Sequence, residues 1–319
     1  MTLAVVAQAQ PHYTVTNLGT AGESSSIPRA INSRGEVGGA VLSATHDLTP
    51  FIYKDGNMQL LPTSIPNGLV VSINERGEAI VSYGFEVTPV VLYKHRQLQS
   101  LPGVNFPIYA AQISDSGDVV GSYQDVAKNQ RAFLYRDRRF QDLGTLGGNL
   151  AEAVSINSRK QIVGLSSVAS GNEDTFILSN GYMQDLGPGF FPNKINDHGQ
   201  IIATQNNVPN TYHAFMYSGG IWRDLGVPAG FIASYGYDIN NQGQAVGVCY
   251  NVNPGPLNSS GSLYEGQMYD LNTLLVPNSG WTITGAEAIN DWGQIAGTGI
   301  RNGQTQALLL SPVRSVIRP

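Results

Sequence analysis

A five-residue pattern, Ile-Asn-x-x-Gly, recurs seven times along the chain and constrains its fold more than any other feature. Its second residue stands at positions 32, 74, 114, 157, 196, 240 and 290, so successive copies are 39 to 50 residues apart. Two copies depart from the pattern, because Ser114 replaces the Asn and Lys160 replaces the Gly. A period in the forties is typical of stacked units of four short strands.

Each copy of the pattern predicts a tight turn between two antiparallel strands. Asn at the first position of such a turn accepts a hydrogen bond from the backbone, and Gly at the fourth position adopts positive φ. The alternative is that the Asn side chains ligate a common group, but ligands rarely need sevenfold repetition. We therefore predict structural roles for Asn32, Asn74, Asn157, Asn196, Asn240 and Asn290, and for Gly35, Gly77, Gly117, Gly199, Gly243 and Gly293.

Three further segments recur with the turn and complete a four-strand unit. The strand that ends at the motif Ile is followed by a second strand after the Gly, such as Gln161–Gly164, and then by a third, aromatic and aliphatic strand, such as Ala132–Tyr135. The fourth strand ends near Asp-Leu-Gly, and its Asp recurs at 142, 185, 224 and 270, which predicts a turn-capping role.

The four-strand unit, repeated seven times with no helical periodicity, predicts an all-β fold. We expect a seven-bladed β-propeller with four-stranded antiparallel blades. The alternative is an open β-solenoid, but the period is too long for a coil of the hexapeptide type.

The two ends of the chain predict how the ring closes. The last repeat stops at its third strand, Gln306–Leu310, whereas Tyr13–Leu18 resembles a fourth strand without a blade. The N-terminal strand is therefore expected to complete the last blade, which removes two open edges. A single propeller would then span residues 11–312, with residues 313–319 as a C-terminal tail.

Residues 1–10 are interpreted as the remnant of a secretion signal, because Ala7-Gln8-Ala9 fits the small-residue cleavage pattern. A disordered leader is the alternative.

The repeated motifs resemble a known family. Gln200 follows the turn Gly199, His213-Ala214-Phe215 stands in the third strand of the fifth repeat, and the chain from Asp142 to Gly148 is Asp-Leu-Gly-Thr-Leu-Gly-Gly. This combination resembles the bacterial extracellular repeats known as the HAF family, over essentially the whole chain. The resemblance implies export, hence a secreted or periplasmic protein, and a propeller-like fold, but no general activity. Only the fifth repeat has a literal His-Ala-Phe.

Composition excludes several classes of partner. Charged residues make up 13% of the chain, against roughly 25% in typical domains, and the formal net charge is −5. A nucleic-acid surface would normally carry a basic patch, so no nucleic-acid partner is expected. No apolar run approaches the roughly 20 residues of a membrane span. We expect a monomer that binds a glycan or a protein.

The lone cysteine and the histidines carry little functional signal. Cys249 cannot form an intrachain disulfide, and a small buried residue is favoured over a reactive thiol. The chain contains no catalytic or metal-binding motif, so no catalytic residue, metal or cofactor is predicted. The five histidines are scattered at 12, 46, 95, 198 and 213, which favours surface or packing roles.

Two hypotheses of function follow. The first is a non-catalytic extracellular binding or scaffold propeller. The second is a propeller enzyme, a lyase or hydrolase acting on a sugar or lactone, with its site at the mouth of the central channel. Converging acid, base or metal-binding side chains would favour the enzyme, whereas aromatic and amide groups alone would favour binding.

The variable loops point to one face of the ring. The loops between second and third strands share a face with the connections between blades, and many aromatic residues lie there. Aromatic rings beside amide groups suit sugars or polypeptides, although these rings could instead only cover the blades. The predicted shallow site lies between blades 5, 6 and 7 and involves Phe190, Phe191, Tyr235, Tyr237, Tyr250 and Trp281.

Charged residues just before the motif Ile predict two ion pairs between neighbouring blades. Innermost strands are largely buried, so an unpaired charge there would be costly. Arg29 of blade 1 and Glu287 of blade 7 are expected to clasp the ring closure, and Lys194 of blade 5 is expected to pair with Asp238 of blade 6.

Overall fold

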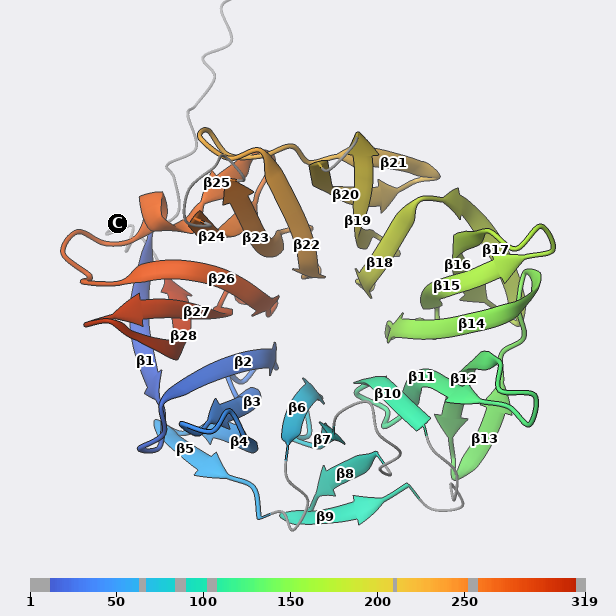
Figure 1. Cartoon of the computed structure of the whole chain (residues 1–319), viewed down its shortest axis with the longest axis horizontal. Coiled ribbons are helices and arrows are strands. Elements are labelled where there is room, and N and C mark those ends of the chain that lie inside the picture. The colour runs from blue at the N-terminus through green and yellow to red at the C-terminus, as the bar shows by residue number, and fades with distance from the viewer. Residues whose placement is uncertain are drawn as a thin grey trace, which may run out of the picture.

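The chain forms a ring of seven four-stranded antiparallel sheets (Figure 1). The computed structural model describes residues 12–62, 67–83, 90–101, 108–208, 211–251 and 258–313. Within blades 1 to 6 the strands follow one another in sequence order, starting with the innermost strand, and in blade 7 the N-terminal strand takes the outermost place. The predicted seven-bladed β-propeller is thereby confirmed. The predicted leader, residues 1–10, and the tail beyond Val313 lie outside the described residues.

The first four blades follow the chain without interruption. Blade 1 contains β2 (Ser25–Ile31), β3 (Val37–Leu42), β4 (Leu48–Lys54) and β5 (Asn57–Leu60). Blade 2 contains β6 (Gly68–Ile73), β7 (Ala79–Tyr83), β8 (Val91–Lys94) and β9 (Gln97–Ser100). Blade 3 contains β10 (Ile108–Ile113), β11 (Val119–Gln124), β12 (Gln130–Arg136) and β13 (Arg139–Asp142). Blade 4 contains β14 (Gly147–Ile156), β15 (Ile162–Val168), β16 (Glu173–Ser179) and β17 (Tyr182–Pro188).

The remaining three blades repeat the same order. Blade 5 contains β18 (Phe190–Ile195), β19 (Ile201–Val208), β20 (Thr211–Ser218) and β21 (Ile221–Asp224). Blade 6 contains β22 (Ala233–Ile239), β23 (Ala245–Asn251), β24 (Asn258–Tyr264) and β25 (Met268–Asp270), followed by the short 3-10 helix η1 (Leu271–Leu274). Blade 7 contains β26 (Thr282–Ile289), β27 (Ile295–Arg301), β28 (Gln304–Pro312) and the N-terminal β1 (Tyr13–Gly19).

The N-terminal strand closes the ring as predicted. β1 lies antiparallel to β28, with Tyr13 opposite Pro312 and Gly19 opposite Ala307 (Figure 1, blue beside red). Tyr13 and Leu18 are buried, and Leu18 belongs to a hydrophobic cluster that joins blade 7 to blade 1. The two ends of the chain therefore share one sheet and one core.

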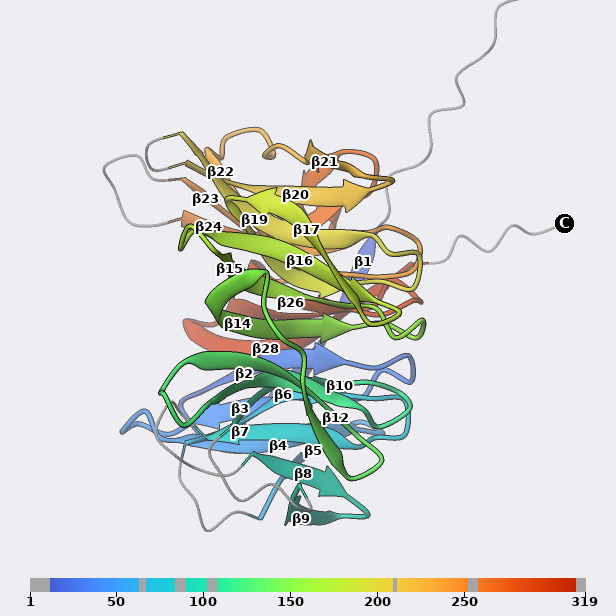
Figure 2. The same ribbon diagram turned by 90° about the vertical axis from the view of Figure 1, so that its right-hand side faces the viewer.

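The ring has two different faces. The motif turns and the hairpins between third and fourth strands lie on one side of the ring, here called the turn face. The loops between second and third strands and the connections between blades lie on the other side, here called the loop face. In the side view the innermost strands β2 and β14 point from the loop face toward the turn face (Figure 2).

Every motif forms the predicted turn. The main-chain N–H of the fourth residue donates to the carbonyl of the first, as from Gly35 to Asn32 at 3.0 Å. The six motif glycines have φ between 73° and 88°, and Lys160 adopts the same left-handed conformation at φ 64°. The recurrent Asp also has its predicted capping role, because Asp142 accepts a hydrogen bond from the main-chain N–H of Gly144 at 2.6 Å.

The motif asparagine joins each blade to the next. Asn32 Oδ1 accepts hydrogen bonds from the main-chain N–H groups of Arg34 and Glu36 at 3.1 and 3.0 Å. Asn32 Nδ2 donates to Glu36 Oε2 at 2.6 Å and to the carbonyl of Asn74, in blade 2, at 3.1 Å. Asn32, Glu36 and Asn74 are buried, so the Asn amide satisfies main-chain atoms that water cannot reach.

The same inter-blade hydrogen bond continues around the ring and forms what we call the amide belt. Its other members join Asn74 to the carbonyl of Ser114, Asn157 to Asn196, Asn196 to Asn240, Asn240 to Asn290, and Asn290 to Asn32. The bonds measure 2.9 to 3.1 Å. The belt therefore couples every pair of neighbouring blades except blades 3 and 4.

The two residues that depart from the motif, Ser114 and Lys160, both lie at the junction of blades 3 and 4, where the amide belt is interrupted. Ser114 of blade 3 carries no amide, and its Oγ contacts Ser116 Oγ at 2.9 Å. From blade 4, Lys160 Nζ contacts Ser116 and reaches Asp118 Oδ2 at 2.9 Å. An ion pair thus replaces the missing amide link between blades 3 and 4.

A buried carboxylate distinguishes blades 1–3 from the rest. Four residues after the motif Asn or Ser, these blades carry Glu36, Glu78 and Asp118, whereas blades 4–7 carry Gln161, Gln200, Gln244 and Gln294. Each carboxylate contacts two cations: Glu36 with Arg34 and Lys54, Glu78 with Arg76 and Lys94, and Asp118 with Arg136 and Lys160.

The cations decide the ionisation of these carboxylates. Burial alone raises the pKa of Glu78, but hydrogen bonds from Lys94, Asn74 and Arg76 outweigh burial and lower that pKa to about 2. The pKa values of Glu36 and Asp118 are lowered by the same balance. All three carboxylates are therefore charged at neutral pH in the folded protein.

Deletion of residues 1–20 is expected to cause a large loss of stability. The deletion exposes the edge of β28 and uncovers the cluster at the junction of blades 7 and 1. The single substitution Leu18→Ala should lower the free energy of unfolding by about 2 to 4 kcal/mol, as measured by urea denaturation. Thr16→Ala, at an exposed position of the same strand, is the control and should change it by less than about 0.5 kcal/mol. A deletion variant that melts like the parent would refute the closure.

Lys160→Gly is expected to be close to neutral. Glycine relieves about 1 kcal/mol of left-handed strain, but the substitution also removes the contact with Asp118, worth up to about 1 kcal/mol. Adding Ser114→Asn restores the amide link, so the double variant should gain about 1 kcal/mol in thermal or urea unfolding. Clear destabilisation of the double variant would show that the motif does not act in blades 3 and 4 as it does elsewhere.

Stability should fall with pH as the three carboxylates protonate. Their pKa values are lower in the folded state than in the unfolded chain, where Glu titrates near 4.3. Their contribution is therefore full above about pH 5 and is lost as the pH falls toward the folded-state value, about 2 for Glu78. Glu78→Gln should cost about 1 to 2 kcal/mol at pH 7, and the difference from the parent should shrink between pH 5 and 2. Exposed Glu173→Gln is the control, and an equal effect there would refute the assignment.

Candidate functional site

Each innermost strand contains a β-bulge at the same place, two residues before the motif Ile. The register of the innermost strand against the second strand shifts there in all seven blades. A bulge re-aims the extra side chain away from the regular pleat. The bulged residues all line the middle of the central channel: Arg29, Val71, Ala111, Val154, Asn193, Tyr237 and Glu287.

These seven residues divide the channel wall into two arcs. Blades 5, 6, 7 and 1 supply the polar arc, which consists of Asn193, Tyr237, Glu287 and Arg29. Blades 2, 3 and 4 supply the apolar arc, which consists of Val71, Ala111 and Val154. The channel therefore presents hydrogen-bonding groups on one side and an apolar surface on the other.

The predicted ion pair at the ring closure lies in the polar arc. Arg29 Nη1 and Glu287 Oε2 are 2.7 Å apart, which confirms that pair. Burial raises the pKa of Glu287, and the charge and hydrogen bond of Arg29 lower it without cancelling the rise. Glu287 is thus a carboxylate whose protonation depends on its single cationic neighbour.

The predicted pairing of Lys194 with Asp238 is not a direct ion pair, but the charge of Lys194 acts on the Asp238 carboxylate. No nitrogen–oxygen contact within 4.0 Å joins these two described side chains. Instead, Asp238 accepts hydrogen bonds from the main-chain N–H groups of Ile239 and, across the blade boundary, Ile289, both at 2.9 Å. Burial raises the pKa of Asp238, and the charge of Lys194 only lowers it in part. The Asp238 carboxylate therefore links blades 6 and 7 through these two hydrogen bonds.

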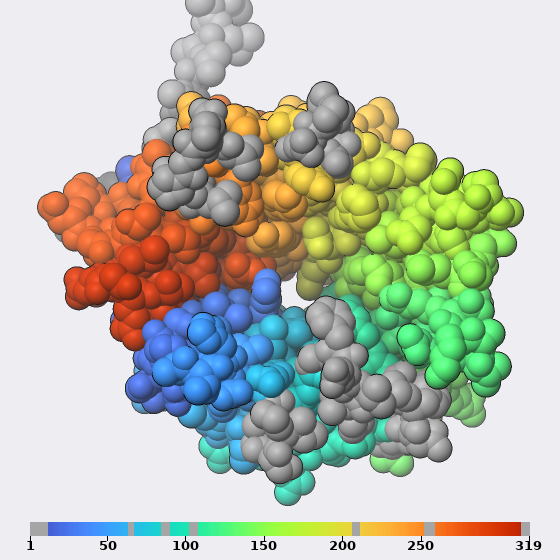
Figure 3. Space-filling view, viewed as in Figure 1, coloured from blue at the N-terminus to red at the C-terminus, as the bar shows by residue number. Residues whose placement is uncertain are grey.

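The channel widens toward the loop face into a funnel with a volume of about 760 Å³. Figure 3 looks down the ring axis and shows the centre hollowed. Besides bulged residues, the funnel is lined by Leu48, Asn67, Leu69, Ser82, Tyr109, Glu152 and Ala153. Cavities of this size accommodate small organic ligands.

Tyr109 and Glu152 add an aromatic ring and a carboxylate to the funnel. Tyr109 is 48% exposed although it stands on an innermost strand. Glu152 accepts a hydrogen bond from Gln130 Nε2 at 2.9 Å. Burial and the nearby Glu173 raise the pKa of Glu152, and Gln130 lowers it only in part. Burial also raises the pKa of Tyr237, so its hydroxyl remains protonated at neutral pH.

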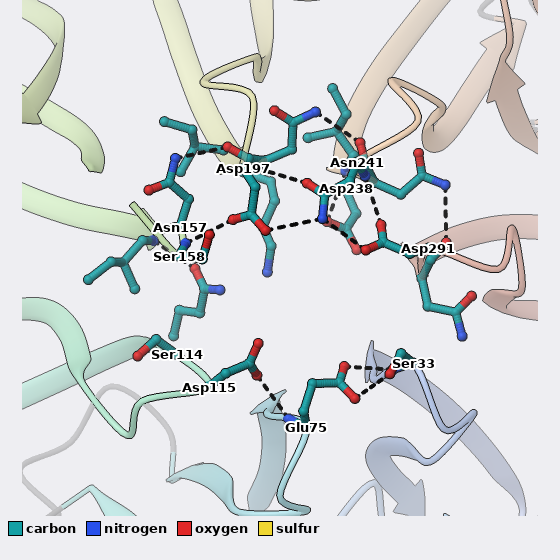
Figure 4. Close-up of a pocket in the computed structure, with 18 of the residues that line it drawn as sticks. Ser33, Glu75, Ser114, Asp115, Asn157, Ser158, Asp197, Asp238, Asn241 and Asp291 are labelled. Atoms are coloured by element: carbon teal, nitrogen blue, oxygen red, sulfur yellow. Dashed lines mark hydrogen bonds between the residues drawn. The ribbon is translucent and has the colours of Figure 1, made fainter. Parts of the chain in front are cut away.

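The opposite mouth of the channel is narrower and acidic. The third residue of each motif lines it, and the cavity there measures about 270 Å³ (Figure 4). The third residues of the seven motifs are Ser33, Glu75, Asp115, Ser158, Asp197, Asn241 and Asp291.

Five of these side chains, the carboxylates and Asn241, accept hydrogen bonds from the main chain of the preceding blade. Asp115 Oδ1 accepts from the main-chain N–H of Glu75 at 2.9 Å, and Asp197 Oδ1 accepts from that of Ser158 at 2.8 Å (Figure 4). In the part of the chain that the structure describes, no three His, Cys, Asp or Glu side chains form a group that could hold a metal ion. The acidic mouth is therefore explained by its links between blades.

Three of the six predicted aromatic residues lie together. Tyr235 stacks on Tyr212 with ring centroids 5.1 Å apart and meets Tyr250 edge-on at 5.6 Å. Tyr237 lines the funnel, and burial together with the neighbouring Tyr250 raises its pKa. This tyrosine cluster therefore supports the polar arc of the funnel from blades 5 and 6.

The other three predicted residues lie elsewhere. Phe190 stacks on Trp222 with centroids 4.1 Å apart, whereas the neighbouring Phe191 is 48% exposed. Trp281 is buried in the hydrophobic cluster between blades 6 and 7, and Arg301 lies over its ring at 5.6 Å. The six residues do not form one shallow site, because alternate residues of a strand face opposite sides of its sheet.

Sequence reasoning missed Tyr109, Glu152 and Asn193 as lining residues. A signal for the bulged position was present, since it always stands two residues before the motif Ile. The bulge itself has no local signature, because the residues that occupy it range from Ala111 to Arg29.

Cys249 is fully buried, and burial raises the pKa of its thiol to about 12. His213 Nδ1 lies 2.8 Å from Asp224 Oδ2 in the third and fourth strands of blade 5, outside the channel. Both residues are held within their own blades, which agrees with the packing roles favoured by the sequence.

Comparison with known proteins identifies the fold alone. No protein-family model matches the chain, and no curated protein matches its sequence. The β-propeller domain of the Trilobed protease from Pyrococcus furiosus is similar, with a TM-score of 0.60 and 8% identity over 92% of this chain and 100% of that chain.

Two other solved structures are similar over nearly their whole length. An oligogalacturonate lyase in complex with manganese has a TM-score of 0.58 and 10% identity, covering 95% of this chain and 94% of that chain. YCF48 bound to D1 peptide has a TM-score of 0.55 and 11% identity, covering 98% of each chain. In the described part of this chain, no helix has the length and apolarity needed to span a membrane.

Proposed function

We propose that this chain is a non-catalytic binding propeller whose ligand, a glycan, occupies the funnel on the loop face. The observation that carries the proposal is the division of the channel wall into a polar and an apolar arc. A sugar ring presents hydroxyl groups around its edge and apolar C–H groups on its faces. The two arcs match those two kinds of surface.

The groups of the funnel have complementary roles in this proposal. Tyr109 offers a partly exposed ring against which an apolar sugar face can pack. Tyr237, Glu287 and Arg29 offer hydroxyl, carboxylate and guanidinium groups for sugar hydroxyls. Arg29 and Glu287 already form an ion pair, so they are held in place before a ligand arrives.

Binding is favoured over catalysis because the carboxylates of the funnel are already engaged. Glu287 is paired with Arg29 at 2.7 Å, and Glu152 accepts from Gln130 at 2.9 Å. A general acid or base needs freedom to exchange a proton with the substrate. One observation nevertheless supports an enzyme: Glu152 and Glu287 both have raised pKa values in the same funnel. A lyase or hydrolase acting on a sugar or lactone is therefore the second candidate.

We also propose that the protein is exported and monomeric. Export rests on the resemblance to extracellular HAF repeats and on the Ala7-Gln8-Ala9 segment. A monomer fits a ring that is closed by its own N-terminal strand, since closure leaves no open sheet edge between first and last blades. A polypeptide is the alternative ligand for the funnel.

The proposal is tested by isothermal titration of the protein with a panel of neutral and acidic oligosaccharides and unstructured peptides. We expect a glycan to bind, and Tyr109→Ala to weaken its binding about tenfold, equivalent to about 1.4 kcal/mol. Tyr237→Phe, which removes one hydroxyl, should weaken binding about fivefold by losing one hydrogen bond.

Tyr182→Ala provides a matched control. Tyr182 is 73% exposed and begins β17 at the turn face, so its loss should leave glycan binding unchanged. Glycan binding that survives both funnel substitutions would contradict the proposed site. Preferential binding of the peptides would favour the polypeptide ligand instead. Cleavage products that accumulate with the parent but not with Glu152→Gln, followed by chromatography, would establish the enzyme.

A further inference from the structure

Two hairpins on the turn face keep a conformation that their residues do not favour. The third and fourth strands of blades 1 to 5 are joined by two-residue turns in which both central residues have positive φ. Such turns favour Asn-Gly, Asp-Gly and Gly-Gly. Blades 1, 4 and 5 follow this rule with Asp55-Gly56, Asn180-Gly181 and Gly219-Gly220.

Blades 2 and 3 break the rule with His95-Arg96 and Asp137-Arg138. Arg96 has φ 63° and Arg138 has φ 60°, at the position where the other three hairpins have glycine. A side chain in this region is strained, and strain that persists is often associated with function. Among the described residues, neither Arg96 nor Arg138 has a carboxylate within the 4.0 Å of an ion pair that would offset the strain.

The two hairpins flank a groove between blades 2 and 3, which His95 and Arg138 line and beside which Arg96 is exposed at the tip of its hairpin. The groove has a volume of about 460 Å³, and Lys94, His95 and Arg138 contribute to its lining. Arg136 and Arg139 line an adjoining hollow of about 470 Å³. Lys94 and Arg136 are the bases of the ion triads with Glu78 and Asp118, so the strand ends that carry the hairpins are fixed by buried charge.

The surface around the groove combines several positive charges with few negative ones. Arg96, Arg138 and Arg139 are exposed, and Asp137 is the acidic residue within these hairpins. The whole chain has a net charge of −5, so an anion would be attracted by a local basic patch such as this one and not by the protein as a whole. Guanidinium groups bind carboxylate and sulfate through paired hydrogen bonds. The ligand that fits is therefore a polyanion long enough to reach both hairpins.

The described parts of the two hairpins and their strands expose no large apolar side chain, which favours an acidic polysaccharide over other polyanions. No large hydrophobic residue is exposed in the described segments 91–101 and 130–142. A protein partner would normally bury an aromatic or aliphatic anchor, and single-stranded nucleic acid would stack its bases on exposed rings. An acidic polysaccharide needs neither, because each of its residues carries a carboxylate or sulfate on a hydrated backbone.

We propose that the His95-Arg96 and Asp137-Arg138 hairpins form a binding site for an acidic polysaccharide. The site lies on the turn face, opposite the funnel, and does not depend on the function proposed for the funnel. In this proposal arginine stands at the glycine position of these two hairpins because its charge binds the ligand, and not because it suits the turn.

The test replaces both arginines with the residue that the turn prefers. The double variant Arg96→Gly and Arg138→Gly should have a higher Tm than the parent and should bind polygalacturonate at least tenfold more weakly at low salt. Gain of stability with loss of binding distinguishes a ligand-binding role from a structural one. A lower Tm, or unchanged polygalacturonate binding, would overturn the proposal.

Lys128→Gly is the matched control for Arg138→Gly. Lys128 is also an exposed cation at positive φ, 69°, in blade 3, but it lies in the loop between β11 and β12 on the loop face. Both substitutions remove one charge and one strained residue, so only the position differs. Lys128→Gly should change polygalacturonate binding less than twofold. An equal loss in both variants would show that net charge, and not the groove, binds the polyanion.

Competing polyanions decide the chemical class. Polyglutamate and single-stranded DNA of matched charge should bind more weakly than polygalacturonate, and equal or tighter binding of either would overturn the assignment to a polysaccharide. Tyr109→Ala, in the funnel, should leave polygalacturonate binding intact. If Tyr109→Ala abolishes that binding while the hairpin variant retains it, the polysaccharide occupies the funnel, and the hairpin site is refuted independently of the funnel.

Discussion

The amide belt is the interaction on which the rest of the ring depends. Each motif Asn satisfies the main chain of its own turn through Oδ1, and its Nδ2 donates to the carbonyl of the next blade. Because these groups are buried near the ring centre, a lost bond would leave polar atoms without water or partner. The same residue therefore shapes the turn and sets the position of the neighbouring blade. The junction without an amide, between Ser114 and Asn157, has the Lys160–Asp118 ion pair instead.

The amide belt places no constraint on other equivalent positions of the seven repeats, so these positions vary from blade to blade. The bulged position two residues before the motif Ile bears no part of the amide belt, so it differs from blade to blade and gives the channel its polar and apolar arcs. The central position of the outer hairpins is free in the same way, provided that the turn tolerates the residue. Arg96 and Arg138 occupy that position at a cost in backbone strain. Function in this protein is thus expected where the repeats differ and structure where they agree.

The fold alone does not choose among functions. Solved propellers of similar shape include a domain of a protease, a lyase in complex with manganese and a protein bound to a peptide, all at about one residue in ten identical. What separates such proteins is the chemistry of their channel and faces. In this chain that chemistry is an engaged Arg29–Glu287 pair, a partly exposed Tyr109 and a protonated Tyr237 in one funnel.

The sequence by itself determined the number of blades, the motif turns, the closure by Tyr13–Gly19 and the Arg29–Glu287 pair. These features are fixed by local turn chemistry and by a period that repeats along the chain, both of which are legible residue by residue. Only the tertiary structure decided that Trp281 is buried, that Asp238 bonds to Ile289 instead of Lys194, and that Tyr109 and Glu152 face the funnel. Those outcomes depend on the bulge in each innermost strand and on contacts between blades. A bulge reverses which side chains face the channel, and the residues that occupy it, from Ala111 to Arg29, share no property that would mark it as a bulge.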